Sequence, residues 1–448
     1  MPKKSNETIE TKLERKTARI GVVGLGYVGL PLAVEYAQHG FVAIGIDVDK
    51  NKIVALQQGK NYIADIDDEV VRTLVSKKRL IPTNTFDKVA SLDAIFICVP
   101  TPFTPSKEPD ISYIISAAEK IGSEMRKGQV IILKSTTFPS TTQSYVLPIL
   151  ERLSKLKVGK DFSLAFSPER IDPGNKQWKT SNIPNVVGGV TPSCTKAAAA
   201  VIGQVVAHVK TVSSPAVAEM EKLLENIFRS VNIALVNELA QLCDRIGGIN
   251  VWEVVEAAAS KPFGFMPFYP GPGIGGHCIL IDPYYLEWYA RAFDFHTNFI
   301  ALAAEVNESM PFYVLNMVLK ELSRLGKKFT NAKVLFLGVA FKRDVNDTRH
   351  SPALKVMELL LNAGIVNVAY NDPFVPEIDV CDKKYNSVGL SPKMLKNADI
   401  VVITTDHSTY DYKMIARTAK CIVDTRNALK GENIDNAKTV VRVLGSGA

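Results

Sequence analysis

The sequence has no long apolar run and no close pair of cysteines. Runs of about eighteen apolar residues, which a membrane-spanning helix needs, are absent, and the first seventeen residues hold no apolar signal-peptide segment. We therefore expect neither membrane insertion nor export, and we predict a cytoplasmic protein. The six cysteines show no CxxC pair and no metal-ligand spacing with the six histidines. This spacing predicts reduced thiols and no bound metal.

Low-complexity segments and a strong charge imbalance are also missing. Hydrophobic residues make up 46% and charged residues 22% of the chain, which is typical of a globular protein. Its 448 residues exceed what a single core usually covers, so two or three domains are expected. The net charge of +7 comes without an aromatic and basic platform, so nucleic-acid binding is not expected. An anionic small-molecule substrate is compatible with this charge.

A strand, a glycine turn and a helix follow one another from Arg19. The glycines Gly24, Gly26 and Gly29 form GxGxxG between strand and helix, and Asp47 ends the second strand. In such a unit the first glycine makes the turn, the second admits a pyrophosphate, and the third lets the helix pack. Asp47 would bind the adenosine ribose and disfavour a 2′-phosphate, which predicts NAD rather than NADP. An ordinary βαβ turn without a cofactor is the alternative.

Apolar strands and amphipathic helices alternate to about residue 210. This alternation predicts an α/β fold with a doubly wound, mostly parallel sheet. Ligands on such sheets bind beyond the carboxyl ends of the strands, where Thr101, Ser135 and Thr136 would lie. For the threonines, helix capping or a turn is the alternative.

Two long helices are expected after this domain. We predict a helical region over residues 214–259 and a second long helix over about 298–325 that connects two lobes. Lys222 and Asn226 stand four residues apart, so both could point into one cleft. A solvated lysine and a capping asparagine are the alternative.

A second α/β unit begins after Lys327. Its turn reads LGVAFK without GxGxxG, so a second dinucleotide is not expected. The basic residues Lys342, Arg343 and Arg349 suit another phosphate-bearing ligand, with solvated surface charges as the alternative.

The stretch GPGIGGHCILIDP, residues 271–283, places Cys278 after four glycines. Asp282 and Pro283 predict a helix N-cap followed by proline at the first helical position, so the thiol would lie near a helix N-terminus that favours thiolate. A thiolate adding to an aldehyde gives a thiohemiacetal, which can lose a second hydride to give a thioester that water hydrolyses. A small packed cysteine is the alternative.

Seven motifs resemble one family in order and spacing. They are GVVGLGYVGLP, VPTP, KSTT, SPER, AEMEKLLENIFR, GPGIGGHCILIDP and LGVAFKRDVNDTRHSPA, and together they resemble the nucleotide-sugar 6-dehydrogenases, the UDP-glucose/GDP-mannose dehydrogenase family. The loop GGHC followed by DPYYL is similar to the UDP-N-acetylhexosamine branch. FYPGPG and NDPFVP are most similar to UDP-N-acetylglucosamine 6-dehydrogenases, with UDP-N-acetylmannosamine and UDP-glucose enzymes as alternatives.

The resemblance implies a role for each matching residue. Cys278 would be the nucleophile, Lys222 would stabilise the oxyanion, and Asp282 would be the base, with a water held by Thr136. Asn226 would hold the sugar and the oxyanion.

Further residues follow from the same resemblance. Glu169 in SPER would assist thioester formation or hydrolysis. The UDP-glucose branch has a second acid four residues later, where this chain has Pro173, so that acid's role does not transfer. The implied cofactor contacts are Gly24, Gly26, Tyr27, Val28, Gly29, Asp47, Lys52, Thr101, Ser135, Thr136 and Arg349. The implied substrate contacts are Glu169, Lys222, Asn226, Tyr269, Gly275 and Lys342.

The resemblance also implies an architecture. We expect a flexible tail over 1–17, an NAD-binding Rossmann domain over 18–212, a central helical dimerisation domain over 213–325 and a UDP-sugar-binding Rossmann-like domain over 326–448. The expected partners are a UDP-sugar and a second copy of the chain, in a homodimer or larger homo-oligomer that makes a uronic acid for polysaccharide synthesis. Two alternatives are a two-electron dehydrogenase of the 3-hydroxyacid type, which needs no cysteine, and a sensor without turnover.

Overall fold

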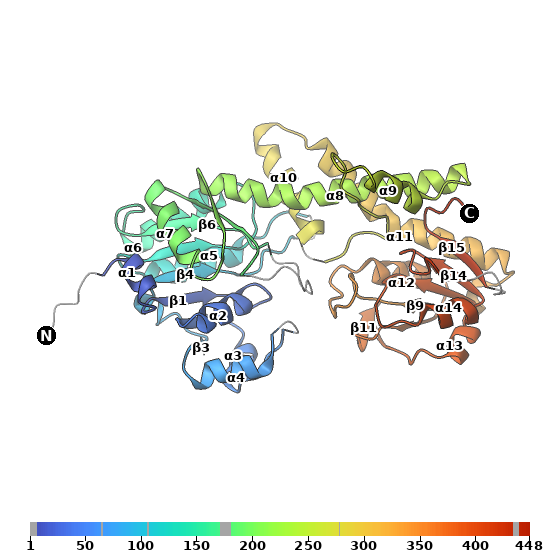
Figure 1. Ribbon diagram of the computed structural model, residues 1–448, viewed down its shortest axis with the longest axis horizontal. Coiled ribbons are helices and arrows are strands. Elements are labelled where there is room, and N and C mark those ends of the chain that lie inside the picture. Colours follow the sequence, from blue (N-terminus) through green and yellow to red (C-terminus); the bar gives the residue numbers. More distant parts are fainter. Residues whose placement is uncertain (1–6, 64–65, 105–106, 171–180, 277, 433–438) are drawn as a thin grey trace. The chain divides into compact units, whose positions relative to one another are not determined.

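The computed structural model (Figure 1) describes residues 7–63, 66–104, 107–170, 181–276, 278–432 and 439–448. His277 and the side chain of Cys278 lie outside the described part. The chain forms two compact units, Met1–Glu225 with Trp288–Phe295, and Asn226–Glu287 with His296–Ala448. No helix of the described ranges combines the length and the apolar character that crossing a membrane requires.

The first unit is built on an eight-stranded sheet in the order β3-β2-β1-β4-β5-β6-β7-β8. Neighbouring strands are parallel except β6 and β7. The strands are β1 (Arg19–Val23), β2 (Val42–Ile46), β3 (Leu80–Thr83), β4 (Ala94–Ile97), β5 (Val130–Leu133), β6 (Ser163–Phe166), β7 (Asn185–Gly189) and β8 (Val209–Val212). The strand order reverses between β1 and β4, which creates a switch point at the carboxyl edge of the sheet.

Helices cover this sheet and bury its central strands on both faces. They are α2 (Gly29–Gln38), α3 (Lys50–Gln57), α4 (Asp68–Ser76), α5 (Ser112–Glu124), α6 (Leu147–Ser154) and α7 (Pro192–Ile202). Ala94 and Phe96 of β4 belong to one hydrophobic cluster, whereas Ile95 and Ile97 belong to another. Alternate residues of a strand point to opposite faces, so β4 must be apolar throughout.

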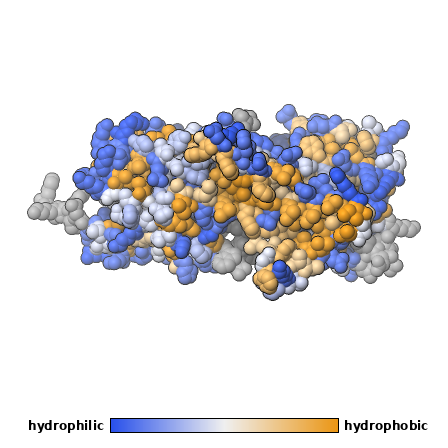
Figure 2. All heavy atoms as spheres, turned by 90° about the horizontal axis from the view of Figure 1, so that it is seen from above, coloured by the Kyte–Doolittle hydropathy of each residue, from blue (hydrophilic) through white to orange (hydrophobic). Residues whose placement is uncertain are grey.

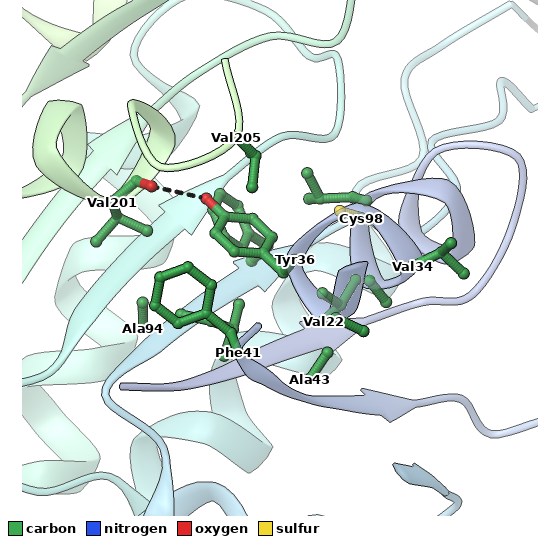
Figure 3. Close-up of a cluster of buried hydrophobic side chains, with 14 of the residues drawn as sticks. Val22, Val34, Tyr36, Phe41, Ala43, Ala94, Cys98, Val201 and Val205 are labelled. Atoms are coloured by element: carbon green, nitrogen blue, oxygen red, sulfur yellow. Dashed lines mark hydrogen bonds between the residues drawn. The ribbon is translucent and has the colours of Figure 1, made fainter. Parts of the chain in front are cut away.

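Figure 3 shows the first of these clusters around Tyr36. The Tyr36 ring meets Phe41 edge to face, with ring centroids 5.8 Å apart. Its hydroxyl donates a hydrogen bond to the carbonyl oxygen of Val201 over 2.9 Å, drawn as a dashed line in Figure 3. The cluster therefore joins α2 to α7 and holds in place the helix that follows the glycine turn.

The expectation of a flexible tail over residues 1–17 is wrong for residues 9–14. They form α1 (Ile9–Glu14), which is capped by Thr8 and buries Leu13 in the core. The Lys12 ammonium lies 2.6 Å from the Asp93 carboxylate. Burial of Leu13 contributes about 1.5–3 kcal/mol to the stability of this segment, in addition to the Thr8 cap and the ion pair.

The second unit is built on a five-stranded parallel sheet in the order β10-β9-β13-β14-β15. Its strands are β9 (Lys333–Leu337), β10 (Asn367–Asn371), β13 (Ile400–Ile403), β14 (Cys421–Asp424) and β15 (Val440–Val443). The hairpin of β11 (Glu377–Val380) and β12 (Lys383–Asn386), like β15, was not expected from the sequence. Here the strand order reverses between β9 and β13. The expected α/β fold is confirmed, with a mostly parallel sheet in the first unit and a parallel one in the second.

Long helices lie where the periodicity predicts them. They are α8 (Pro215–Ile246) and α11 (Asn298–Arg324), with the short helix α9 (Val251–Ala259) after α8, and the boundary between the two units falls within α8. The shorter helices α12 (Pro352–Asn362), α13 (Pro392–Asn397) and α14 (Tyr412–Thr418) accompany the second sheet.

The predicted helix start at Asp282 and Pro283 is wrong. The helix α10 spans Cys278–Ala290, with Pro283 in its interior. Asp282 is therefore not an N-cap. An Asp-Pro pair gives the same pattern at a start and inside a helix, and here the preceding apolar turn is helical because Ile281 is buried. Cys278 becomes the first residue of the helix, and Asp282 follows it by one turn.

Candidate functional site

The three glycines of the first turn differ in what surrounds them. Gly24 has a φ of +90°, and a Cβ there would lie 2.5 Å from the Cys98 carbonyl oxygen. A Cβ at Gly29 would lie 1.8 Å from the Gly24 carbonyl oxygen, whereas one at Gly26 would meet no protein atom within 4 Å. Packing therefore requires the first and third glycines, and the second faces open space where a phosphate can approach.

The Asp47 carboxylate is tied to this turn. Its Oδ2 accepts the Leu25 N–H over 2.8 Å, and its Oδ1 accepts the Asp49 N–H over 2.9 Å. The Lys52 ammonium lies 3.5 Å from the same carboxylate. Tyr62 donates its hydroxyl to the Leu25 carbonyl oxygen over 2.7 Å. Each carboxylate oxygen keeps acceptor capacity, as binding two ribose hydroxyls requires.

The remaining cofactor candidates of the first unit lie beyond the carboxyl ends of its strands. Thr101 is buried after β4, and Ser135, after β5, donates its hydroxyl to the Val99 carbonyl oxygen over 2.7 Å. Val28 stands at the N-cap position of α2 without a capping side-chain hydrogen bond, and the neighbouring Tyr27 side chain is exposed. These residues surround the switch point between β1 and β4, which is the expected place for a dinucleotide.

Glu169 is paired with a buried lysine. The ammonium of Lys134 lies 3.5 Å from the Glu169 carboxylate and donates to the Asn185 side chain over 3.3 Å. The next residue, Arg170, forms ion pairs with Glu221 and Glu225 of α8. The SPER segment is thereby held against the first half of α8.

Glu219 is a buried residue that sequence reasoning missed. Its carboxylate accepts the Ser140 N–H over 2.6 Å, and the Thr142 N–H and hydroxyl over 2.9 and 2.6 Å. Burial raises its pKa above the ordinary value. Lys222, which is only 7% exposed, follows it by one helical turn. Glu219 therefore fixes the segment after Thr136 to the helix that carries Lys222. The sequence did contain a signal for Glu219, because an acidic residue on the apolar face of a helix needs a polar partner when it is buried.

Asn226 and Asp282 come together in the second unit. The Asn226 amide donates a hydrogen bond to the Asp282 carboxylate over 2.5 Å, and both side chains are buried. These two residues, 56 positions apart in the chain, thus form one polar pair. Its acid, Asp282, follows Cys278 by one turn of α10.

Buried asparagines hold the beginning of the glycine-rich loop. The Asn237 side-chain oxygen accepts the Gly271 N–H over 2.9 Å, and its amide donates to Asn307 over 2.9 Å. Asn307 in turn donates to the Ser230 carbonyl oxygen over 3.0 Å. This chain joins the loop to α8 and α11.

The loop glycines pack closely against the protein itself. A Cβ at Gly271 would lie 2.6 Å from Nη1 of Arg426, and one at Gly275 would lie 2.5 Å from the Phe341 side chain. The Gly276 N–H donates to the Arg349 carbonyl oxygen over 2.9 Å. Gly275 is thus brought beside the segment that carries Lys342. Arg426, which follows β14, was not singled out from the sequence.

The basic candidates of the second unit have different surroundings. The Arg349 guanidinium pairs with Asp347 over 2.6 Å, and Arg343 lies 3.4 Å from the Asp406 carboxylate. Lys342, which directly precedes Arg343 in the chain, is half-buried. Tyr269 is exposed and stacks on Trp252 with ring centroids 5.6 Å apart.

The other cysteines of the described part are free thiols. Burial raises the pKa of Cys98 to about 12 and that of Cys421 to about 11, and it also raises the pKa of Cys243. Cys194 is buried and Cys381 is exposed. Burial therefore disfavours the thiolate at the three shifted cysteines.

Three successive regions match one family. Residues 18–206 match the UDP-glucose/GDP-mannose dehydrogenase family NAD binding domain, residues 216–309 its central domain and residues 335–431 its UDP binding domain. The chain belongs to this family. The resemblance read from the motifs is confirmed, and the chain is an oxidoreductase that uses NAD.

Relatives within the UDP-glucose/GDP-mannose dehydrogenase family match almost the whole chain. UDP-N-acetyl-D-glucosamine 6-dehydrogenase of Pseudomonas aeruginosa is 34% identical over 402 residues, covering 90% of each chain. NDP-N-acetyl-D-galactosaminuronic acid dehydrogenase of Ralstonia nicotianae is 33% identical, covering 93% of this chain and 97% of the relative. The structure of UDP-D-ManNAc dehydrogenase from Pyrococcus horikoshii matches with a TM-score of 0.86 at 32% identity, covering 96% and 99% of the two chains.

The residues described above fall within the matched domains of this dehydrogenase family. The NAD-binding domain holds the glycine turn and Asp47, and the open space at Gly26 fits the pyrophosphate of NAD. The UDP-binding domain holds Lys342 and Arg426.

Proposed function

We propose that this protein is an NAD-dependent UDP-N-acetylglucosamine 6-dehydrogenase, which oxidises the C6 hydroxymethyl group of the sugar to a carboxylate. The coarser assignment is a nucleotide-sugar dehydrogenase of the UDP-N-acetylhexosamine branch, and it rests on the family and on the relatives. Glucosamine is favoured by the motifs FYPGPG and NDPFVP and by the Pseudomonas aeruginosa relative. Mannosamine and galactosamine substrates are the alternatives, because relatives named for them match equally well.

The buried pair of Asn226 and Asp282 is the observation that carries the proposed mechanism. An acid held by a neutral amide, one helical turn after Cys278, is suited to move protons to and from a substrate bound at the thiol. In the first oxidation Asp282, through a water held by Thr136, takes the proton of the C6 hydroxyl. NAD would supply the hydride acceptor for C6, with one NAD molecule for each of the two oxidations.

Cys278 retains the substrate between the two oxidations. Its thiolate adds to the C6 aldehyde, a carbon–sulfur bond forms, and the carbonyl oxygen becomes an oxyanion beside Lys222 and Asn226. Loss of the second hydride leaves a thioester. Water, deprotonated by Asp282 with assistance from Glu169, then breaks the carbon–sulfur bond, which frees the acid and restores the thiolate.

Ligand contacts complete the proposal. Gly24, Gly26, Tyr27, Val28, Gly29, Asp47, Lys52, Thr101, Ser135, Thr136 and Arg349 contact NAD. Glu169, Lys222, Asn226, Tyr269, Gly275 and Lys342 contact the UDP-sugar, and we add Arg426 because its guanidinium lies against Gly271. An arginine can bind two oxygens of a phosphate at once.

A homodimer is part of the proposal. The half of α8 in the second unit exposes apolar side chains at helical spacing, namely Phe228, Leu235, Leu239, Leu242 and Ile246. On the face seen in Figure 2, hydrophobic residues gather in a broad area. An exposed apolar helix face of this kind is typical of an interface between protein chains.

A panel of nucleotide sugars tests the assignment. Purified protein is mixed with NAD and with UDP-N-acetylglucosamine, UDP-N-acetylmannosamine, UDP-N-acetylgalactosamine or UDP-glucose, and NADH is followed. We expect the highest kcat/KM with UDP-N-acetylglucosamine and two NADH per acid formed. Preference for another acetamido sugar overturns the glucosamine assignment alone, whereas activity confined to UDP-glucose overturns the branch.

A further inference from the structure

Two loops meet at the switch point of the second sheet. The loop Gly338–Asp344 follows β9 and carries Lys342, and the loop Thr404–Ser408 follows β13. Because the strand order reverses between β9 and β13, a ligand of this domain is expected at these two loops. The shape of the loop Gly338–Asp344, called the Lys342 loop below, therefore sets where Lys342 can meet such a ligand.

Hydroxyl groups join the two loops closely. Thr404 donates its hydroxyl to the Gly338 carbonyl oxygen, and Thr405 donates its hydroxyl to the Ala340 carbonyl oxygen, each over 2.5 Å. Farther along the loop, Nε of Arg343 donates to the Asp406 carbonyl oxygen over 2.5 Å. The Lys342 loop is thus anchored to the loop after β13 by its backbone before Lys342 and by the Arg343 side chain after it.

His407 is the buried centre of this contact, with no exposed surface. Its Nδ1 accepts the Asp344 N–H over 3.0 Å, and its Nε2 lies 3.0 Å from Oδ2 of Asp372. Since a backbone N–H can only donate, Nδ1 carries no proton, and Nε2 donates to the carboxylate. His407 therefore bridges the end of the Lys342 loop to the residue that follows β10.

Asp372 completes the bridge at the other end of the same loop. Its Oδ2 also accepts the N–H groups of Val339 and Ala340 over 2.7 and 3.0 Å. Its Oδ1 accepts the N–H groups of Phe374 and Val375 over 2.8 and 3.1 Å. Burial opposes its ionisation, but the hydrogen bonds from His407 and from the backbone prevail and hold the pKa of Asp372 below its ordinary value.

Asp372 has the topological place that Asp47 has in the first unit. Each acid follows the second strand of its unit and accepts an N–H from the turn after the first strand. Asp47 binds two backbone N–H groups, whereas Asp372 binds four and His407 in addition. The acid that binds ribose in a dinucleotide domain is here fully used in holding a loop.

We propose that His407 and Asp372 are positioning residues that set the Gly338–Asp344 loop, and with it Lys342, for the UDP moiety. The inference rests on the proposed binding of a UDP-sugar by this loop. Asp372 holds the loop at Val339 and Ala340, and His407 holds it at Asp344. The ammonium of Lys342 is then presented from a backbone that is fixed on both sides, which reduces the entropy lost on binding.

Three substitutions at position 407 separate the two hydrogen bonds. In His407→Gln the amide can still donate to Asp372, and in His407→Asn the side-chain oxygen can still accept from Asp344, whereas His407→Ala loses both. We expect His407→Ala to raise both the KM for the UDP-sugar and the Kd for UDP by about tenfold. The kcat and the KM for NAD should change less than about twofold, and the two amide variants should lie between His407→Ala and wild type.

Asp399→Asn is the matched control. Asp399 is buried in the same unit, but it precedes β13 and accepts the Lys333 N–H over 3.1 Å, at the edge of the sheet where β9 and β13 begin. This variant should lower Tm and leave the KM for the UDP-sugar unchanged. The same pattern in the His407 variants, a lower Tm with unchanged KM and Kd, overturns the positioning role. If His407→Ala does not fold, the two amide variants decide the question. A wild-type protein that binds no UDP overturns the proposed function first, and the positioning role with it.

Discussion

The Asn226 amide donates a 2.5 Å hydrogen bond to the Asp282 carboxylate, and both side chains are buried. A buried carboxylate needs such a donor because burial removes the water that would otherwise stabilise its charge. The amide supplies that donor without adding a charge of its own. Asp282 is therefore held in a defined orientation while it remains able to accept a proton.

Asn226→Ala should remove this donor and lower kcat by about 10²- to 10³-fold, because the acid loses its orientation and the oxyanion loses a hydrogen bond. The KM for NAD should stay within about twofold. Steady-state kinetics with NADH detection checks this. Asn232→Ala, on the same helix with its amide on the Phe228 carbonyl oxygen, should keep full activity. Equal losses in both variants would contradict the role of Asn226.

Cys278→Ala should form no uronic acid, because without the thiolate the aldehyde has no route to a thioester. Product analysis by mass spectrometry together with NADH counting checks this. Cys381→Ala changes an exposed cysteine of the β11–β12 hairpin and should leave the reaction unchanged. A Cys278→Ala enzyme that still forms NADH at a wild-type rate, with the same product as wild type and one NADH per product, would favour the two-electron alternative, which needs no cysteine.

Gly26→Ala and Gly29→Ala should separate binding from folding. The added Cβ at position 26 meets no protein atom but enters the space expected for the pyrophosphate, so Tm should hold and the Kd for NAD should rise by about tenfold or more. At position 29 it meets the Gly24 carbonyl oxygen, which should cost at least about 1–3 kcal/mol of stability. Thermal melts and calorimetric NAD titration check both. A lower Tm in Gly26→Ala would show that its surroundings are not open.

Stability should depend on pH through Glu221. Burial, and secondly the hydrogen bond with Glu225, raises the pKa of Glu221 from 4.5 to about 7. A raised folded-state pKa means that the favourable contribution is complete below about 4.5 and is lost as the pH rises through about 7. Glu221→Gln cannot ionise, so its Tm relative to wild type should increase across this range. Glu119→Gln, at an exposed glutamate, should show no such trend. A constant difference between Glu221→Gln and wild type would contradict the prediction.

Local sequence patterns were sufficient to predict those features that depend on a single element and its adjoining turn. The GxGxxG turn, the long helices and the second α/β unit each depend on periodicity or on glycine positions within about thirty residues. The Asp-Pro pair at 282–283 shows the limit of such patterns. Local preference allows a helix start there, but buried contacts extend the helix back to Cys278.

Contacts between distant segments could not be read from the chain. Asp372 and His407 are 35 residues apart, and Glu219 is 77 residues from Thr142, so no local spacing links them. Their partners are mostly backbone N–H groups, which every residue except proline carries and which therefore leave no mark in the sequence. The helix α1 was also missed because its contacts are with distant parts of the chain. Leu13 is buried in the core, and Lys12 pairs with Asp93.

The sequence by itself determined the α/β class, the glycine turn of the NAD-binding domain and the family, and it predicted most residues of the candidate site. These depend on local backbone requirements and on ordered motifs. Only the tertiary structure decided that Asp282 is an interior helical residue bound to Asn226, that the loop glycines make room for Arg426 and Phe341, and that Asp372 supports a loop. The physical reason is that hydrogen-bond partners and close approaches are set when separate elements pack, not by the elements themselves.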